Sequence, residues 1–138
     1  MNDSAILLSG RATFTLEGKG LRWTFQVAKS KDEERPAFFA KMLTGSDNES
    51  DFTYLGMLDP ATKHVRLTRA SKMAADSVPV RAMDWAANLM LTGRTSDIER
   101  QGFRVLWAST CARCGRTLTV PSSIDSRLGP ECAKHVQA

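Results

Sequence analysis

The sequence is poor in cysteine, in histidine and in long apolar runs, and each shortage excludes a class of protein. Its 138 residues include three cysteines, all beyond position 110, and two histidines. An odd number of cysteines gathered at one end is not a disulfide framework, which fits a reducing compartment. No apolar run approaches the length of a membrane span, and the start, MNDSAILLSG, lacks the features of a signal peptide. We therefore expect a soluble cytoplasmic protein without a membrane partner.

The residues best suited to chemistry are concentrated in one C-terminal stretch, CARCGRTLTVPSSIDSRLGPECAKH. Cys111 and Cys114 form one pair with x-x spacing, Cys132 and His135 form a second pair, and seventeen residues lie between the two pairs. Zinc prefers thiolate and imidazole ligands at tetrahedral angles, and this spacing lets one turn present two ligands to the same ion. We predict one structural Zn²⁺ per chain, bound by these four side chains.

The residues around both pairs are typical of a treble-clef-like finger, in which a knuckle and a short hairpin precede a helix that carries ligands. Gly115 directly follows Cys114, where the turn of a knuckle often requires a positive φ. Pro130 suits the first position of a helix that would place the second ligand pair on one face. The alternative is a redox-active first pair, but it would leave the second pair unexplained.

Four basic side chains stand beside the ligands. Residues 94–138 contain seven Lys/Arg and four Asp/Glu, so most of the net charge of +4 belongs to this part of the chain. The basic side chains can offset the negative charge of a three-thiolate zinc centre, or they can contact a partner or the phosphates of a nucleic acid. They are Arg113, Arg116, Arg127 and Lys134.

The same stretch resembles the C-terminal module of a family of small phage and prophage proteins of unknown function. Tails of that family read roughly CxRCGRxLTxPxSIxxGxGPxCA, and TGSDNESDFTYLG, residues 44–56 here, resembles a stretch upstream in those proteins. The resemblance implies a phage origin, a bacterial host cell and zinc binding, but no activity. The family pattern usually has Gly near Arg127, and Cys is common where this chain has His135.

Residues 1–108 are expected to form an α+β body with an antiparallel meander sheet. Apolar and polar residues alternate in several segments, and residues 17–20 suit a hairpin turn. The last predicted strand runs directly into Cys111, so we expect residues 109–138 to form a zinc-binding module packed on this body. The predicted strands are residues 11–16, 21–27, 37–43, 52–58, 64–69 and 103–108.

One long helix is predicted between Ser77 as N-cap and Gly93 as the stop, and residues 94–101 are predicted to be a polar connector. The apolar residues of this helix recur at helical spacing, and we expect their face to lie across one side of the sheet. Trp85 belongs to this set, and we interpret it as a core residue more readily than as a stacking platform for a base. The set is Val78, Ala82, Trp85, Ala86, Leu89 and Met90.

Two further features have an ordinary interpretation beside a functional one. Asp47, Glu49 and Asp51 are oxygen donors at alternate positions, as in a calcium loop, but the central Gly and distal Glu of an EF-hand are missing. A polar turn that caps its own backbone is the better interpretation. His64 stands alone on a predicted strand, so an exposed histidine is favoured over a catalytic one.

Three classes of function remain to be weighed. A zinc enzyme needs an open coordination position, whereas four protein ligands close the shell, and no HExxH or deaminase motif is present. We therefore predict a non-catalytic, zinc-stabilised binding protein that acts on a host or phage protein. Nucleic-acid binding through the basic finger is the explicit alternative, supported by a pI of about 9.2.

Overall fold

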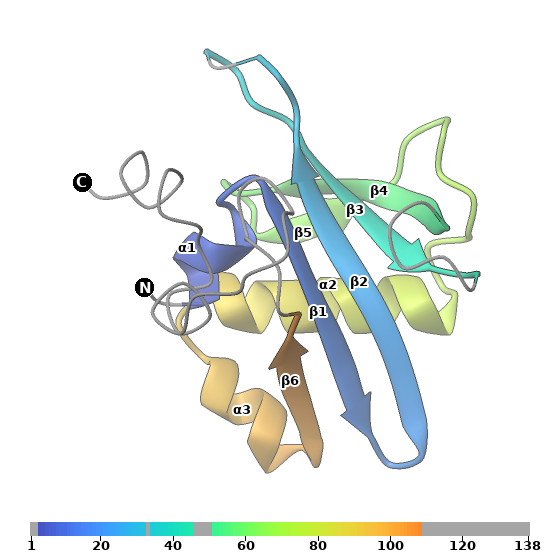
Figure 1. Cartoon of the computed structure of the whole chain (residues 1–138), viewed down its shortest axis with the longest axis vertical. Helices are drawn as coiled ribbons and strands as arrows, with labels where there is room; N and C mark the ends of the chain where they lie inside the picture. The colour runs from blue at the N-terminus through green and yellow to red at the C-terminus, as the bar shows by residue number, and fades with distance from the viewer. Residues whose placement is uncertain (1–2, 33, 46–50, 109–138) are drawn as a thin grey trace.

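The computed structural model describes residues 3–32, 34–45 and 51–108. This part of the chain is an α+β body in which three helices accompany one sheet (Figure 1). In chain order the elements are α1 (Asp3–Leu7), β1 (Arg11–Gly18), β2 (Leu21–Lys29), β3 (Phe38–Leu43), β4 (Phe52–Asp59), β5 (His64–Arg66), α2 (Val78–Leu91), α3 (Thr95–Arg100) and β6 (Phe103–Trp107).

The sheet has six strands in the order β5-β4-β3-β2-β1-β6, and every neighbouring pair is antiparallel. Strands β1 to β5 follow one another as a meander, and β6 returns to the free edge of β1. The predicted antiparallel meander is therefore confirmed, and so is the hairpin between the first two strands. Its connection is Lys19–Gly20, where both residues have a positive φ, as a type I′ turn requires.

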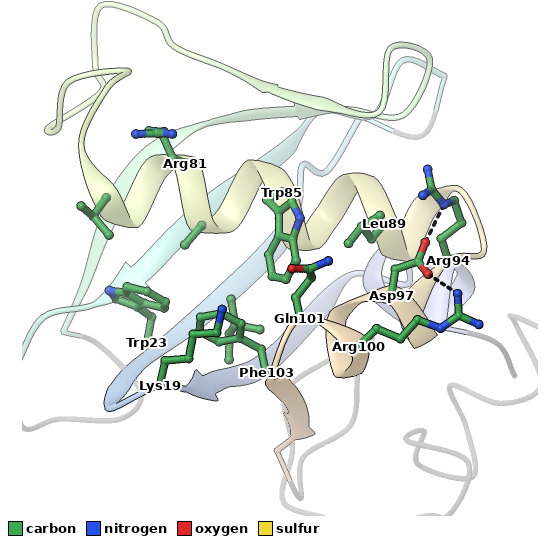
Figure 2. Close-up of a pocket in the computed structure, with 13 residues that line it drawn as sticks. Lys19, Trp23, Arg81, Trp85, Leu89, Arg94, Asp97, Arg100, Gln101 and Phe103 are labelled. Atoms are coloured by element: carbon green, nitrogen blue, oxygen red, sulfur yellow. Dashed lines mark hydrogen bonds and ion pairs between the residues drawn. The ribbon is translucent and has the colours of Figure 1, made fainter.

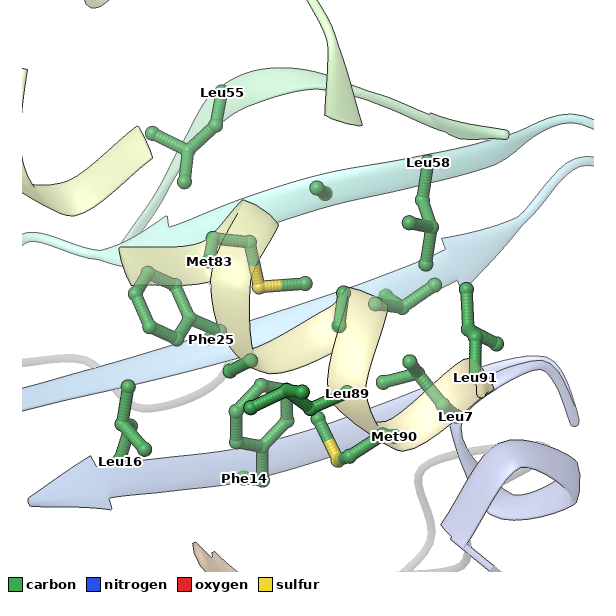
Figure 3. Packing of buried hydrophobic residues seen from close by; sticks show 14 of the residues in the cluster. Leu7, Phe14, Leu16, Phe25, Leu55, Leu58, Met83, Leu89, Met90 and Leu91 are labelled. Atoms are coloured by element: carbon green, nitrogen blue, oxygen red, sulfur yellow. The ribbon is translucent and has the colours of Figure 1, made fainter. Parts of the chain in front are cut away.

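The core lies between one face of the sheet and α2, which crosses behind the strands in Figure 1. Ala12, Phe14 and Leu16 of β1 alternate with more exposed residues and are fully buried, as the sequence predicts. Leu7 of α1 joins the same cluster next to the C-terminal end of α2 (Figure 3). The largest fully buried side chains are Phe14, Phe25, Leu7, Leu16, Leu55, Leu58, Met83, Met90, Ile98 and Val27.

The helix α2 confirms the predicted long helix, and three of the six residues assigned to its apolar face are buried as expected: Ala86, Leu89 and Met90. The buried face is nevertheless shifted from the predicted one. Val80, Met83 and Ala87 are buried, and none of them was assigned to the apolar face. Val78, which was assigned to it, is 58% exposed. The apolar arc of α2 is wider than the sheet covers, so the sequence alone does not tell which part of the arc faces the core.

Ser77 occupies the N-cap position of α2 without making the expected cap. Its hydroxyl donates to the carbonyl oxygen of Ala74 at 2.7 Å, so the side chain closes the preceding turn instead. The predicted stop is confirmed, because Gly93 has a φ of +73° directly after the C-cap Thr92.

Three predictions about the chain between these elements were wrong or incomplete. Residues 94–101, predicted to be a polar connector, contain α3, which is held to the core by the fully buried Ile98. No helix was predicted where α1 lies. The fifth strand ends at Arg66 and not at Arg69, since the amide of Thr68 bonds the hydroxyl of Ser71 at 2.9 Å in a turn.

Among the described residues, every helix is too short or too polar to cross a membrane.

Candidate partner-binding groove

The predicted zinc site lies outside the described residues. The four proposed ligands and the four basic residues beside them all belong to residues 109–138, which the structure does not describe. The boundary between a body and a zinc module stays a prediction. Within residues 3–32, 34–45 and 51–108 there is no group of three or more His, Cys, Asp or Glu side chains that could hold a metal ion. The residues concerned are Cys111, Cys114, Cys132, His135, Arg113, Arg116, Arg127 and Lys134.

The described body carries a groove between α2 and the end of the β1–β2 hairpin, with the start of β6 as part of its floor (Figure 2). Its volume is about 590 Å³, which falls in the range of ligand-binding clefts. We call it the aromatic groove. Its lining residues are Leu16, Lys19, Trp23, Val78, Arg81, Ala82, Trp85, Leu89, Arg94, Asp97, Arg100, Gln101 and Phe103.

Three aromatic rings from three elements meet in the aromatic groove. The ring of Trp85 on α2 meets the ring of Phe103 edge-on, with centroids 5.7 Å apart and planes at 67°. Trp23 on β2 lies nearly parallel to Phe103, with centroids 6.5 Å apart and planes at 25°. All three rings are partly buried and pack against the main core. Aromatic pairs in such offset and edge-on geometries are favourable, so this side of the groove is preformed.

Gly18 lets Phe103 approach Trp23. It faces Phe103 across the β1–β6 pair and Leu21 across the β1–β2 pair. A Cβ atom on Gly18 would lie 2.8 Å from Cα of Phe103 and would also meet the carbonyl oxygen of Gly102. Both are backbone atoms, so a side chain at position 18 would displace the start of β6.

We expect Gly18→Ala to lower the free energy of unfolding by about 1 to 3 kcal/mol, the usual cost of overpacking. The first residues of β6 would move away from β1, and the Trp23–Phe103 contact would be lost with them. Thermal unfolding and near-ultraviolet circular dichroism measure both effects. Gly20→Asn is the matched control, because nothing lies within 4 Å of a Cβ there and Asn tolerates the positive φ of +78°. Equal stability of the two variants would contradict this packing.

The wall on the α2 side is a second apolar stripe of that helix. Val78, Ala82, Trp85 and Leu89 follow one another at intervals of four, three and four residues, which keeps them on one flank of a helix. The buried stripe with Met83 points at the sheet, and the flanking stripe lines the groove. The apolar residues assigned to the core by their spacing are therefore in part groove residues.

Cationic side chains stand around this apolar surface. Lys19 extends from the hairpin turn, and its Nζ lies over the ring of Phe103 at 5.6 Å from the centroid. Arg81 projects from α2 on the opposite side of the groove (Figure 2). In the described part of the chain neither cation has a carboxylate within ion-pair distance.

One carboxylate lies at the far end of the aromatic groove, and two arginines share it. Arg94 Nε lies 2.8 Å from Oδ2 of Asp97, and Arg100 Nη1 lies 3.2 Å from Oδ1 (Figure 2). The arginine side chains are 64% and 77% exposed, so these ion pairs add little stability. The groove lining thus holds four cations and one anion, and it is electropositive.

His64 has a partner that the sequence did not suggest. Its Nδ1 lies 3.1 Å from Oδ1 of Asp84 on α2, and the same oxygen accepts the amide of Val65 at 2.7 Å. Nearby, the side-chain amide of Asn88 donates to the carbonyl oxygen of Lys63 at 3.0 Å. These bonds tie the edge strand β5 to α2, which is a structural role. The prediction of an exposed strand histidine is confirmed.

The acidic loop that could have bound calcium is mostly outside the described residues. Asp47 and Glu49 lie outside the described residues, and Asp51 is the first described residue after them. The backbone at Asp51 accepts the amide of Thr44 at 2.8 Å, which closes the loop between β3 and β4.

Comparison with known proteins places the C-terminal part of the chain beside one family. Residues 106–137 match a family of unknown function, DUF6011. That part of the chain is similar to an uncharacterised family. The match spans both predicted ligand pairs and leaves the aromatic groove outside it. No curated protein and no solved structure matches the chain.

Proposed function

We propose that this protein is a non-catalytic binding protein, stabilised by one zinc ion, that acts on a host or phage protein in the cytoplasm of a bacterial cell. Inhibition of a host system is the kind of activity that this implies. A phage origin is proposed from the resemblance of both the C-terminal stretch and residues 44–56 to small phage proteins. The observation that carries the binding role is the aromatic groove.

The composition of the aromatic groove supports a protein partner. Protein interfaces are enriched in Trp, Phe and Arg at their buried centre, and such residues contribute most of the binding energy. Here Trp23, Trp85 and Phe103 line the same concave surface as Arg81, and their ring contacts preform it. Partly buried aromatic rings need little reorganisation on binding, which favours affinity.

The role proposed for zinc is structural. Three thiolates and one imidazole are a donor set that zinc accepts, and four protein ligands leave no position for a reactive water. Cys111, Cys114, Cys132 and His135 would hold the ion, and the ion would link two segments that the sequence separates by seventeen residues.

We expect the zinc-loaded protein to show no hydrolysis or deamination of nucleic acids or nucleotides, because a closed ligand shell cannot activate water. Product analysis by chromatography after prolonged incubation measures this. Turnover that persists in the wild type but is abolished in a His135→Ala variant that still contains zinc would contradict the structural role.

Affinity capture from bacterial lysate, with and without nuclease treatment, tests the proposed function. We expect a captured protein that survives nuclease treatment and is lost from an Arg81→Glu, Trp23→Leu double variant. Release of all captured material by nuclease would contradict a protein partner. Capture by the double variant at the wild-type level would show a protein partner that binds elsewhere.

The second candidate, nucleic-acid binding, is favoured by the basic residues of the C-terminal stretch. If Arg113, Arg116, Arg127 and Lys134 each neutralise a duplex phosphate, the slope of log affinity against log salt should be about −3 to −4. Replacing Arg113 and Arg116 together should reduce its magnitude by about two. Fluorescence anisotropy of a labelled duplex at several salt concentrations measures the slope. A flat salt dependence in folded, zinc-loaded protein would exclude this candidate.

A further inference from the structure

We propose that the aromatic groove binds an acidic segment of the partner protein, which inserts an apolar side chain between Trp23 and Trp85 and directs carboxylates to Arg81 and Lys19. This inference rests on the proposed function and names the chemistry of the partner at one site. Three properties of the described residues carry it: the aliphatic wall, the uncompensated cations and the limited access to the aromatic faces.

The aliphatic wall indicates what enters the aromatic groove. Leu16 and Leu89 form its buried floor, Ala82 is partly buried, and Val78 is 58% exposed. The exposed Val78 and the partly buried Ala82 and Trp85 leave apolar surface of α2 open to water inside a groove. Burying it contributes about 25 cal/mol per Å², so an apolar side chain is the favoured occupant.

The cations indicate what accompanies that side chain. Lys19 and Arg81 flank the rings from opposite sides, and neither has a carboxylate partner among the described residues. A carboxylate beside the inserted side chain could bond the guanidinium of Arg81 in a bidentate geometry. At the far end of the groove, Arg94 and Arg100 share a single anion, Asp97, so this end also favours a negative partner. Charge complementarity therefore selects an acidic segment.

The ring geometry disfavours a nucleobase as the occupant. A stacking platform for single-stranded nucleic acid needs accessible ring faces along a continuous basic track. Here the rings of Phe103 and Trp85 meet edge to face, Lys19 lies over the ring of Phe103, and aliphatic side chains separate these rings from the arginines at the far end of the groove. The surface matches a segment that alternates carboxylates with leucine-like or aromatic side chains better than it matches a row of bases.

Selection from a random 12-residue peptide library displayed on phage tests this inference. Wild-type zinc-loaded protein and an Arg81→Glu variant serve as parallel targets, and Arg66→Glu is the control with the same charge change on the exposed strand β5. We expect wild type and the control to enrich peptides with an excess of Asp and Glu around an apolar residue, and the Arg81→Glu variant not to do so. Selected peptides that are neutral or basic, or no enrichment on any target, would overturn the proposal.

The leading peptide is then titrated into a Trp107→Phe background, in which the only indoles are those of Trp23 and Trp85. We expect their fluorescence to change on binding, with Arg81→Glu weakening the affinity about tenfold and Arg66→Glu leaving it unchanged. Lys19→Asn removes the second cation while preserving the turn, and a weakening of about threefold is expected. Tighter binding of oligo(dT) of twelve nucleotides than of the peptide, with the same fluorescence change, would assign the groove to nucleic acid and overturn the proposal.

Failure of this inference is distinguishable from failure of the proposed function. A nuclease-resistant protein partner that is captured equally by wild type and by Arg81→Glu would leave the binding role intact and remove the groove from it. Loss of every protein partner after nuclease treatment would contradict both the proposed binding role and the assignment of the groove to it.

Discussion

Replacing Cys114 by Ser is expected to abolish stoichiometric zinc binding and to unfold residues 109–138. Structural zinc commonly provides about 10 to 16 kcal/mol of apparent binding free energy, and a site with three ligands keeps only part of it. The wild type should contain one zinc per chain and the variant less than half an equivalent, as measured by elemental analysis of protein purified without a metal-affinity tag. Limited proteolysis should then remove the C-terminal stretch from the variant and leave residues 3–108 intact.

Ser123→Ala is the control, because it lies in the same stretch and is not a proposed ligand. It should retain one zinc and resist the protease. A wild type with less than half an equivalent of zinc would contradict the metal site. A Cys114→Ser variant that loses zinc without becoming sensitive to protease would contradict its structural role.

Phe14→Ala is expected to have the largest effect on the body itself. Phe14 is fully buried on β1, and its ring lies 5.7 Å from that of Phe25 and 5.6 Å from that of Trp107. Phe→Ala changes in a core cost about 3 to 5 kcal/mol, because the cavity left behind collapses only partly. Since small domains are stable by only about 5 to 15 kcal/mol, the melting temperature should fall by about 15 °C or more.

The matched control is Phe39→Ala on β3, whose side chain lies on the opposite face of the sheet and is only partly buried. It contacts Tyr54 edge-on at 6.1 Å and should cost about 1 kcal/mol. Urea unfolding measures the free energy of unfolding of both variants. Equal destabilisation of the two would contradict the assignment of the core to the α2 side of the sheet.

The strands were predictable because burial on one face leaves a period of two in the sequence. Ala12, Phe14 and Leu16 carry that pattern, and the residues opposite them on β2 repeat it. The hairpin at Lys19–Gly20 was predictable as well, since a short link that contains Gly between two alternating segments is typical of a hairpin.

The short helices and the groove could not be predicted for two physical reasons. The α1 and α3 helices have 5 and 6 residues, which is too short for a helical period to stand out, and each is held by a few tertiary contacts such as that of Ile98. For α2, the apolar arc holds both a core stripe and a groove stripe. Met83 faces the core and Trp85 faces the groove only because of where the sheet lies against the helix, which the sequence does not reveal. The excess width of that arc is the signal that could have indicated a second contact surface.

The zinc site was predicted from the spacing of its ligands, the residues that flank them and a family resemblance, and the similarity of residues 106–137 to an uncharacterised family does not test it. Ligand pairs at finger spacing are informative because few other arrangements need them. A partner-binding surface leaves no such local pattern in the sequence, because its side chains come from α2, β2 and β6 and meet only in the fold.

The measurement that tests the central claim most directly is the nuclear magnetic resonance spectrum of the three indole N–H groups, with and without the protein partner recovered by affinity capture. Trp23 and Trp85 line the aromatic groove, whereas the indole N–H of Trp107 bonds Asp3 at 3.2 Å, away from the groove lining. If the groove is the binding site, the signals of Trp23 and Trp85 shift or broaden at one equivalent of partner, and that of Trp107 stays in place. A shift of Trp107 alone, or of none of the three in a complex shown to be formed, would contradict the claim.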